Sequence, residues 1–297
     1  MTLPAYQGIY PMILSFYGGD GELDTSPIAK QIEAFIKHGA HGVAVLGLAT
    51  EINKLSLAER HQVVEASSLA LQGRLPFSVT VGENSVKGQI SFAKTAKSSG
   101  ANWLILQPPP VTGISELELQ RFFGSVADQI DIPIAIQNAP DYLGIGLSLQ
   151  GIAELHQQHP NICIVKIEDD ALAISPLLDA TGGKVGVFVG RGGLGTPDLL
   201  RAGAVGIIPG AESFDRLVGV FEAMQDNDEA EAETTYGEIE SLLVFLEGPI
   251  NQFVTYSREL IVRRLGLTLP VHHRLPSPIS PFGIKIIERV AKKIGPL

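Results

Sequence analysis

Lys166 has the position best suited to covalent chemistry. It ends the apolar run Ile162–Val165 and is followed by Ile167, Glu168 and Asp169. A lysine at the inner end of a buried strand is costly to keep charged, and burial favours the neutral amine. A neutral amine is a nucleophile that can form a Schiff base with a carbonyl carbon. The position therefore indicates chemistry on a keto compound. A lysine that caps a strand and reaches solvent is the structural alternative.

Glu168 is the natural partner of this lysine. It lies two residues beyond Lys166, so on an extended chain both side chains face the same way. A carboxylate beside an amine can shuttle protons during imine formation, or remove a proton next to the imine carbon. A purely structural ion pair would have the same spacing, so both interpretations stay open.

The elements that must position these residues alternate along the first 225 residues. Apolar runs predict strands at Gly8–Leu14, Gly42–Leu46, Phe77–Val81, Trp103–Leu106, Ile132–Ile136, Ile162–Lys166, Lys184–Val189 and Ala204–Ile208. Helical periodicity follows each run, at Pro27–His38, Leu57–Leu71, Val86–Ser99, Glu116–Ile130, Leu149–Gln158, Ala171–Ala180, Pro197–Ala202 and Phe214–Gln225. Eight such pairs predict an α/β fold, the (β/α)8 TIM barrel. A doubly wound open sheet is disfavoured because an early glycine-rich dinucleotide fingerprint is missing.

The pattern changes after Gln225. Asp226–Thr235 is acidic and rich in alanine, and its acidic residues are interpreted as the solvated start of a helix. Further helices are predicted, without strands between them, at Tyr236–Phe245, Ile250–Leu265 and Pro281–Ile294. We therefore expect a barrel over residues 1–225 and a C-terminal helical segment over residues 226–297 that packs on it.

Composition excludes several classes of protein. The 297 residues are 45% hydrophobic and carry a formal net charge of −10, which disfavours nucleic acid and anionic membranes as partners. The single cysteine, Cys163, lies in an apolar run and is interpreted as an inert core thiol. The N-terminus does not resemble a signal peptide, and no window has the roughly 18 apolar residues of a membrane span. We expect a cytoplasmic protein.

The strand-end rule selects the candidate binding residues, because catalytic groups of a barrel gather at the C-terminal ends of its strands. These candidates are Ala49, Thr50, Gln137, Asn138, Arg191, Gly192 and Gly193. The hydroxyl of Thr50 could orient a substrate carboxylate, and Arg191 could clamp a carboxylate or a phosphate. The two glycines would let backbone N–H groups approach an anion. The histidines lie away from the strand ends, so no metal is assigned.

The turn after the second predicted strand has two further features. Ser56 and Glu59 predict a capping box at the start of the second helix. Glu51 follows the turn between apolar neighbours, and we interpret it as a structural residue that holds the loop or a subunit interface.

Together these residues resemble the dihydrodipicolinate synthase and N-acetylneuraminate lyase superfamily of class I, Schiff-base-forming lyases. Gly47-Leu48-Ala49-Thr50-Glu51, followed by Leu55 and Glu59-Arg60, is similar to the family's Gly-x-x-Gly-Glu signature. Lys166 falls at the family's imine lysine. Two further elements resemble the family's Gly-Ala-x-Gly-x-x-x-Gly and Arg-Pro-Pro elements, at Gly203–Gly210 and Arg274-Leu275-Pro276. The resemblance implies a homo-oligomer, a tetramer or a dimer, without a cofactor.

The departures from the family pattern narrow the expected activity. The synthase and the sialic acid lyase carry a tyrosine where this chain has Gln137, and an amide cannot replace it as an acid or base. The family's paired threonines are Leu48 and Ala49 here, and its aromatic residue after strand four is missing from Gln107–Val111. The combination resembles a branch that acts on 2-keto-3-deoxy sugar acids and includes dehydratases.

We therefore expect a lyase, either a dehydratase or an aldolase, of a small 2-keto-3-deoxy sugar acid. The resemblance implies that Lys166 forms the imine. Glu168 is the candidate acid–base group, Asn138 or Gln137 would hold a hydroxyl, and Tyr142 is a less favoured acid. Two alternatives stay open. One is a non-catalytic sugar-acid-binding protein, since fold does not imply function. The other is a divergent dihydrodipicolinate synthase, disfavoured because three elements of its relay are replaced.

Overall fold

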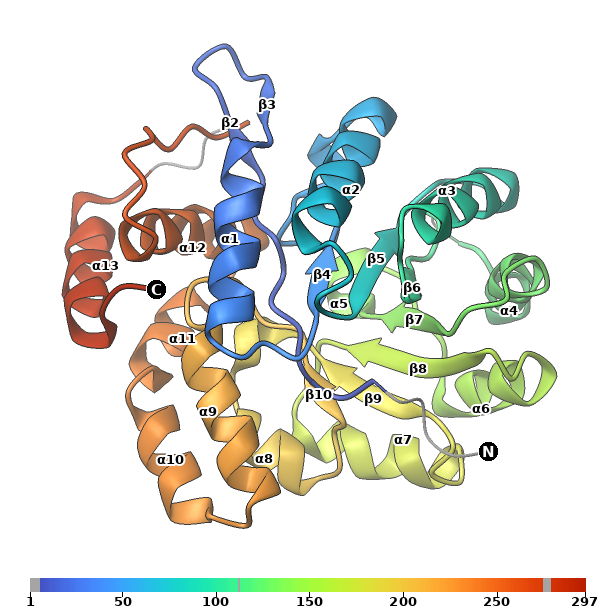
Figure 1. The fold of residues 1–297 in the computed structure, drawn as a ribbon. Coiled ribbons are helices and arrows are strands. Elements are labelled where there is room, and N and C mark those ends of the chain that lie inside the picture. The colour runs from blue at the N-terminus through green and yellow to red at the C-terminus, as the bar shows by residue number, and fades with distance from the viewer. Residues whose placement is uncertain (1–5, 112, 275–278) are drawn as a thin grey trace.

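Eight parallel strands form one curled sheet in the computed structural model, which describes residues 6–111, 113–274 and 279–297 (Figure 1). The order across the sheet is β1 (Gly8–Ile9), β10 (Gly206–Ile207), β9 (Gly186–Val189), β8 (Ile162–Ile167), β7 (Ile134–Asn138), β6 (Trp103–Leu106), β5 (Phe77–Val81) and β4 (Val43–Val45). The sheet closes where Met12, beyond β1, forms a parallel bridge with Ala44 of β4. The predicted (β/α)8 barrel is confirmed.

Prolines account for two differences between the predicted and observed strands. β1 covers only the start of the predicted run Gly8–Leu14, because Pro11 has no backbone N–H to give to a ladder. The carbonyl of Pro11 still accepts a hydrogen bond from Ala44 at 3.1 Å, so the closure survives. β7 begins after Pro133, two residues later than predicted, and extends through Gln137 and Asn138.

Helices surround the sheet (Figure 1). They are α1 (Ser26–Lys37), α2 (Leu57–Leu71), α3 (Val86–Ser98), α4 (Glu116–Ala127), α6 (Leu149–Gln158), α7 (Ile174–Ala180), α8 (Thr196–Arg201) and α9 (Phe214–Gln225). Three of them, α2, α6 and α9, have the predicted bounds. The capping box of α2 is confirmed, since Ser56 Oγ accepts from the Glu59 N–H at 3.3 Å and the Glu59 carboxylate accepts from the Ser56 N–H at 2.8 Å.

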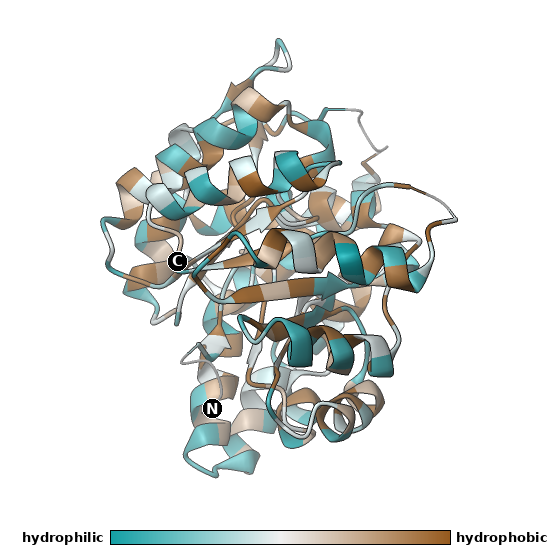
Figure 2. Cartoon of the chain, turned by 90° about the vertical axis from the view of Figure 1, so that its right-hand side faces the viewer, coloured by the Kyte–Doolittle hydropathy of each residue, from teal (hydrophilic) through white to brown (hydrophobic). Residues whose placement is uncertain are grey.

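Alternation along the strands separates two apolar layers. Residues that point into the barrel form a small cluster that includes Tyr10, Trp103, Ile164 and Phe188, and the outward residues pack against the helices in a much larger cluster. Figure 2 shows the apolar strands between helices of mixed character. Lys166 lies two residues beyond Ile164 on β8, so it is on the inner face of the barrel.

Several short elements were not predicted. β2 (Phe16–Tyr17) and β3 (Leu23–Asp24) form an antiparallel hairpin between β1 and α1. The short helix α5 (Pro140–Leu143) follows β7 directly and carries Tyr142. Three 3-10 turns, η1 (Ile52–Lys54), η2 (Ala171–Ala173) and η3 (Arg191–Gly193), shape the loops after β4, β8 and β9. These turns position the strand-end residues of the site.

The C-terminal segment consists of α10 (Glu229–Gly237), α11 (Glu240–Leu246), α12 (Ile250–Arg264) and α13 (Pro281–Ile294). The acidic run starts a helix as predicted, and Asp228 caps it by accepting from the Glu231 N–H at 3.1 Å. The prediction of one helix over Tyr236–Phe245 is wrong, because α10 ends at Gly237, a poor helix former, and α11 begins at Glu240. Leu275 and Pro276 lie outside the described residues.

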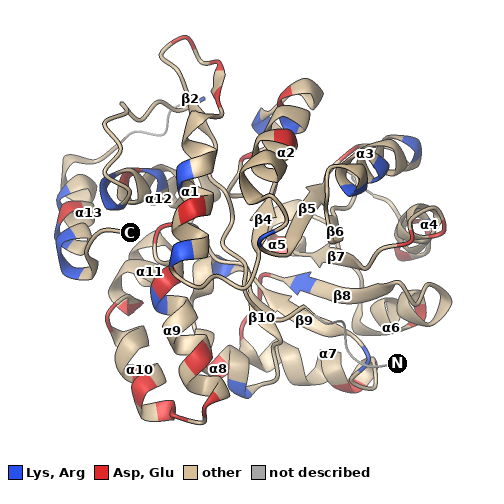
Figure 3. Cartoon of the chain, viewed as in Figure 1, with Lys and Arg blue, Asp and Glu red and all other residues tan. Residues whose placement is uncertain are grey.

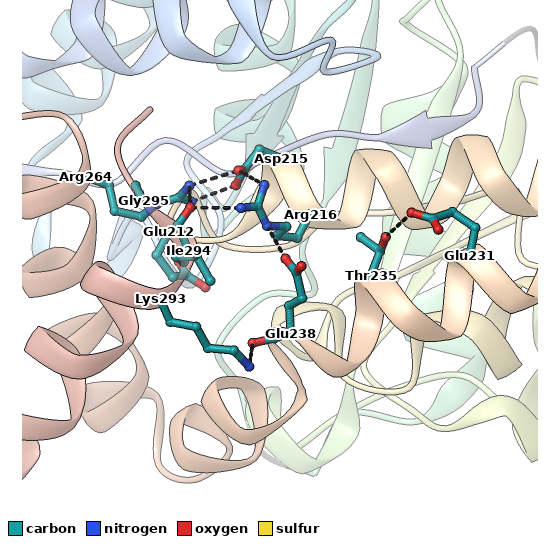
Figure 4. A network of polar contacts seen from close by, with 10 residues as sticks. All are labelled: Glu212, Asp215, Arg216, Glu231, Thr235, Glu238, Arg264, Lys293, Ile294 and Gly295. Carbon is teal, nitrogen blue, oxygen red and sulfur yellow. Dashed lines mark hydrogen bonds and ion pairs between the residues drawn. The ribbon is translucent and has the colours of Figure 1, made fainter.

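A buried ion pair joins the C-terminal segment to the barrel (Figure 4). Arg264 of α12, whose side chain is fully buried, donates to both carboxylate oxygens of Asp215 in α9, at 2.7 and 2.9 Å. It also donates to the backbone carbonyl of Glu212 at 2.9 Å. A bidentate pair of this kind fixes orientation as well as distance, so α12 is held in one position beside the end of β10.

Charged residues lie mostly on the helices and loops around the sheet (Figure 3). In the described part of the chain, no helix combines the length and the apolar character that a membrane span requires. Gln137 of β7 and Lys166 of β8 are polar exceptions to the apolar strands, and both lie near the carboxyl ends of their strands.

Candidate active site

A pocket lies at the C-terminal ends of the strands. The barrel supplies its inner wall, including Ala49, Lys166, Glu168, Gly190 and Gly210. The outer wall comes from the connection between α11 and α12 and from the helices on either side, and includes Leu243, Leu246, Glu247, Ile250 and Phe253. The site therefore uses residues from both parts of the chain distinguished in the sequence, on either side of residue 225.

Lys166 lies at the inner end of this pocket. Its residue surface is 5% exposed, and its ammonium group donates a hydrogen bond to Glu168 Oε1. The expectation that the two side chains face the same way is confirmed. An amine that is nearly enclosed, open only to a pocket and paired with a carboxylate has a proton acceptor at hand, which is what attack on a carbonyl carbon needs.

The Glu168 carboxylate is held from two further sides. The backbone N–H of Arg191 donates to Oε2 at 2.6 Å, and the amide of Gln137 makes a long 3.5 Å contact to Oε1. Gly190 leaves the space that the carboxylate occupies, because a Cβ there would lie 2.0 Å from Glu168 Oε2. The loop after β9 and the strand β7 thus fix the orientation of the acid.

Two buried glutamines extend the contacts across the barrel. Gln107 Nε2 donates to Gln137 Oε1 at 3.0 Å, and the backbone carbonyl of Gln107 accepts from Gln89 Nε2 at 2.8 Å. Gln107 and Gln137 are 3% and 2% exposed. Gln107 was not predicted as a site residue. The alternation of Trp103, Ile105 and Gln107 along the strand nevertheless indicates that its side chain points into the barrel.

The turn after β4 presents backbone groups to the pocket. Leu48 and Ala49 line it, and among the described residues no acceptor binds the backbone N–H of Leu48, Ala49 or Thr50. The Thr50 side chain is fully buried, and its hydroxyl donates to the Ile13 carbonyl at 2.6 Å. That hydroxyl therefore ties the turn to the chain beyond β1, and the backbone of the turn is what remains for a ligand.

Glu51 has the structural role expected of it. It takes a left-handed backbone conformation, with φ 62°, and its carboxylate accepts from Arg258 of α12, whose side chain is fully buried. It also pairs with Lys54 of η1. A non-glycine residue in this conformation needs such support, so the pair holds the end of the turn against the C-terminal segment.

The remaining candidates are divided between the pocket and its supports. Arg191 and Gly192 line the pocket, and the Arg191 guanidinium donates to Glu247. Gly193 is buried, and Leu217 lies where its Cβ would be. Asn138 uses its amide on the Leu147 backbone, donating at 3.1 Å and accepting at 2.7 Å, so it holds the loop after α5.

Tyr142 is brought into the pocket by the unpredicted helix α5. Burial, and then the negative charge of Glu168, raise the pKa of its phenol. It is the one tyrosine among the residues described as lining the pocket. Glu247 also lines the pocket and was missed, because the strand-end rule does not reach the C-terminal segment. Across the described ranges, no three His, Cys, Asp or Glu side chains come together as a metal site.

Comparison with known proteins identifies the family to which this chain is similar. The model of the "Dihydrodipicolinate synthetase family" matches residues 5–283. A 4-hydroxy-tetrahydrodipicolinate synthase of Methanoculleus marisnigri is 28% identical over 243 residues, 80% of this chain and 83% of that protein. The Escherichia coli protein named "Probable 2-dehydro-3-deoxy-D-pentonate aldolase YjhH" is 25% identical over 263 residues, covering 86% of this chain and 87% of the relative.

Solved structures share the fold. YagE of Escherichia coli, solved in complex with pyruvate, superposes with a TM-score of 0.88 at 24% identity, over 98% of this chain and 99% of that one. The sialic acid aldolase of Ruminococcus gnavus has a TM-score of 0.87 at 20% identity, over 97% of each chain. Since the family model covers almost the whole chain, this protein belongs to the dihydrodipicolinate synthetase family and is a lyase of that family.

Proposed function

We propose that this lyase forms a Schiff base between Lys166 and a small 2-keto acid, and that its substrate is a 2-keto-3-deoxy sugar acid. The observation that carries the proposal is the nearly enclosed Lys166 amine, which opens to a pocket and is paired with Glu168. The name of the Escherichia coli relative, a pentonate aldolase, supports the substrate class. The pyruvate complex of a structural neighbour supports a keto acid in this fold.

The substrate carboxylate binds the turn after β4. The backbone N–H groups of Leu48, Ala49 and Thr50 have no acceptor among the described residues, and two of these residues line the pocket. Successive backbone N–H groups in a turn form an anion-binding concavity. Thr50 contributes through its backbone, while its hydroxyl holds the turn in place.

Imine formation needs a proton acceptor and then a proton donor. Glu168 takes a proton from the Lys166 ammonium, and the free amine adds to the keto carbon of the substrate. A proton passes from the added nitrogen to the new alkoxide, Glu168 returns its own proton to the resulting hydroxyl, and water leaves as the C=N bond forms. The contacts from Arg191 and Gln137 keep the carboxylate beside the amine throughout.

The imine makes two reactions possible. In dehydration, Glu168 removes a proton from C3, and the hydroxyl on C4 leaves as water after receiving a proton. In aldol cleavage, a base takes the proton of the C4 hydroxyl, and the C3–C4 bond breaks to give the enamine of pyruvate. Gln137 is buried beside Gln107 and Glu168, and its amide cannot transfer a proton to or from the substrate. Tyr142 offers an ionisable phenol in the pocket, in addition to Glu168.

Product analysis tests this proposal. The protein is incubated with the stereoisomers of 2-keto-3-deoxypentonate, and the products are measured by mass. A product that has lost water identifies a dehydratase, and pyruvate with a two-carbon aldehyde identifies an aldolase. If no isomer is converted, a sugar-acid-binding member of the family without turnover replaces the proposal.

A second candidate is a divergent dihydrodipicolinate synthase. The observation in its favour is the name of the relatives, among them one from Methanospirillum hungatei that is 30% identical over 75% of this chain. Gln137 at the position of the relay tyrosine argues against it. Turnover of pyruvate with aspartate semialdehyde would favour it. The homo-oligomer implied by the family resemblance stays a prediction, which light scattering tests.

A further inference from the structure

The outer end of the pocket holds a charge pair that the reaction itself does not use. Arg191 extends from η3 and donates to Glu247, which follows α11. Both residues line the pocket, and their side chains are 25% and 46% exposed. The Arg191 backbone contacts Glu168, so the length of one arginine side chain separates the reacting carboxylate from Glu247. The pair therefore lies where the far end of a substrate would be.

The charges of the pocket balance before a substrate enters. Its charged lining residues in the described chain are two cations, Lys166 and Arg191, and two carboxylates, Glu168 and Glu247. A keto acid adds one negative charge at the turn after β4. A second anionic group, at the far end of the substrate, would need to pair with Arg191. The guanidinium of Arg191 is already paired with the Glu247 carboxylate.

Another acidic group lies near the same end. Asp170, on the loop after β8, lines a groove together with Arg191. Two carboxylates, Glu247 and Asp170, thus lie near the one guanidinium of Arg191, and a second anion would approach a region that they make negative overall. Hydroxyl groups suit this end better, because Glu247 can accept from them and Arg191 can donate to them.

We propose that Glu247, by occupying Arg191, selects substrates whose far end is neutral and hydroxylated, and excludes those that end in a phosphate or a second carboxylate. This inference rests on the proposed function and specifies the substrate class of that site. An arginine without a partner could bind a carboxylate or a phosphate, whereas Arg191 is already paired with Glu247.

Two keto acids of equal length test the selection. 5-Hydroxy-2-oxopentanoate ends in a hydroxyl and 2-oxoglutarate ends in a carboxylate. Each is trapped on the protein with borohydride, and its half-saturating concentration is measured by intact mass. The wild-type protein is expected to take the hydroxy acid at the lower concentration. In Glu247→Gln, the half-saturating concentration of 2-oxoglutarate should fall by about tenfold relative to that of the hydroxy acid. This is the effect expected of one elementary charge at a partly exposed site.

Matched variants isolate the pair. Glu240→Gln removes the same charge from α11 at an exposed position outside the pocket lining, and should leave the ratio unchanged. In the double variant Arg191→Met with Glu247→Gln, the gain for 2-oxoglutarate should disappear, because the freed guanidinium is what binds the second anion.

Three results would overturn the inference. They are a wild-type preference for 2-oxoglutarate, an unchanged ratio in Glu247→Gln, and a gain that persists without Arg191. Trapping of pyruvate on the wild-type protein distinguishes a failure of the proposed function from a failure of the selection by Glu247. If pyruvate is trapped and the ratio does not move, only the selection by Glu247 fails. If no keto acid is trapped at all, the proposed function fails and the inference fails with it.

Discussion

The side-chain amide of Gln107 donates a hydrogen bond of 3.0 Å to the side-chain oxygen Oε1 of Gln137 in the interior of the barrel. This contact fixes which way the Gln137 amide points, because the oxygen is engaged by Gln107 and the NH2 group is left facing Glu168 at 3.5 Å. Gln137 can therefore support the charged form of Glu168 through a donor, although it cannot exchange protons with the substrate.

Replacement of Gln137 by leucine should slow the reaction without preventing the imine. The change removes a donor from Glu168 and leaves the buried Gln107 amide without its partner. A hydrogen bond to a charged group corresponds to about 10- to 100-fold in rate. Turnover of the substrate and borohydride trapping are measured together. Gln107→Leu, which removes only the orienting contact, should have the smaller effect. Wild-type turnover in both variants would refute the role of this pair.

Glu168→Gln should slow both turnover and imine formation at Lys166, because Glu168 is the proton acceptor and donor of that step. Loss of a positioned acid–base group costs about 10²- to 10⁴-fold. The neighbouring Asp169 provides the control, because it is exposed and Asp169→Asn removes the same charge one residue away. Steady-state kinetics should separate the two variants by at least the lower limit of that range. Equal rates would show that Glu168 is only a structural partner of Lys166.

The Glu51–Arg258 pair should matter for stability more than for chemistry. Glu51→Ala leaves the fully buried Arg258 side chain without its carboxylate, which is expected to cost about 3–5 kcal/mol of unfolding free energy. Chemical denaturation measures the change. The exposed pair of Lys97 with Asp131 is the control, and Lys97→Met should change the midpoint little. Similar small effects of both substitutions would contradict the structural role.

Glu212 should make the folded protein less stable as the pH rises. Its side chain is fully buried, neither carboxylate oxygen has a hydrogen-bond partner in the described structure, and burial raises the pKa to about 7. Between the unfolded value near 4.5 and this pKa, the folded state holds a proton that the unfolded state has released. The stability contributed by the protonated acid is therefore full below pH 4.5 and is lost progressively up to about pH 7.

The variant Glu212→Gln removes this titration. It should be more stable than the wild type at pH 8, by about 3 kcal/mol at most, and the advantage should shrink towards pH 5. Thermal unfolding of both proteins at the two pH values gives the difference. Groups whose pKa values are lowered, such as Glu59, act in the opposite direction but are common to both proteins and cancel. A pH-independent difference would contradict the prediction.

The sequence predicted the barrel because its strands are apolar on both faces and a helical segment follows each strand, and three helices of the barrel have the predicted bounds. It predicted Lys166 and Glu168 as neighbours because a period of two puts them on one face of β8. It did not show that the side chains of Thr50 and Asn138 form hydrogen bonds with the backbone of Ile13 and Leu147. Strand-end position says where a polar residue lies, but not whether the chain itself binds its polar atoms.

Two pocket residues depended on tertiary structure. Tyr142, named from the sequence as a less favoured acid, reaches the pocket because α5 turns the chain immediately after β7, and that short helix was not predicted. Glu247 reaches it because Arg264 and Arg258 hold α12 on the barrel, a long-range arrangement with no local pattern. The helix break at Gly237 was missed because one glycine inside a periodic segment is a weak signal.

Borohydride reduction in the presence of pyruvate tests the central claim most directly. The wild-type protein should gain one reduced pyruvyl group, and peptide mass mapping should locate it on Lys166. Lys166→Arg keeps the charge but removes the nucleophile, and should give no adduct under the same conditions. Its near-ultraviolet circular dichroism spectrum should match that of the wild type, which shows that the variant is folded. An adduct on another lysine, or none on the wild-type protein with pyruvate or a 2-keto-3-deoxypentonate, would contradict the account.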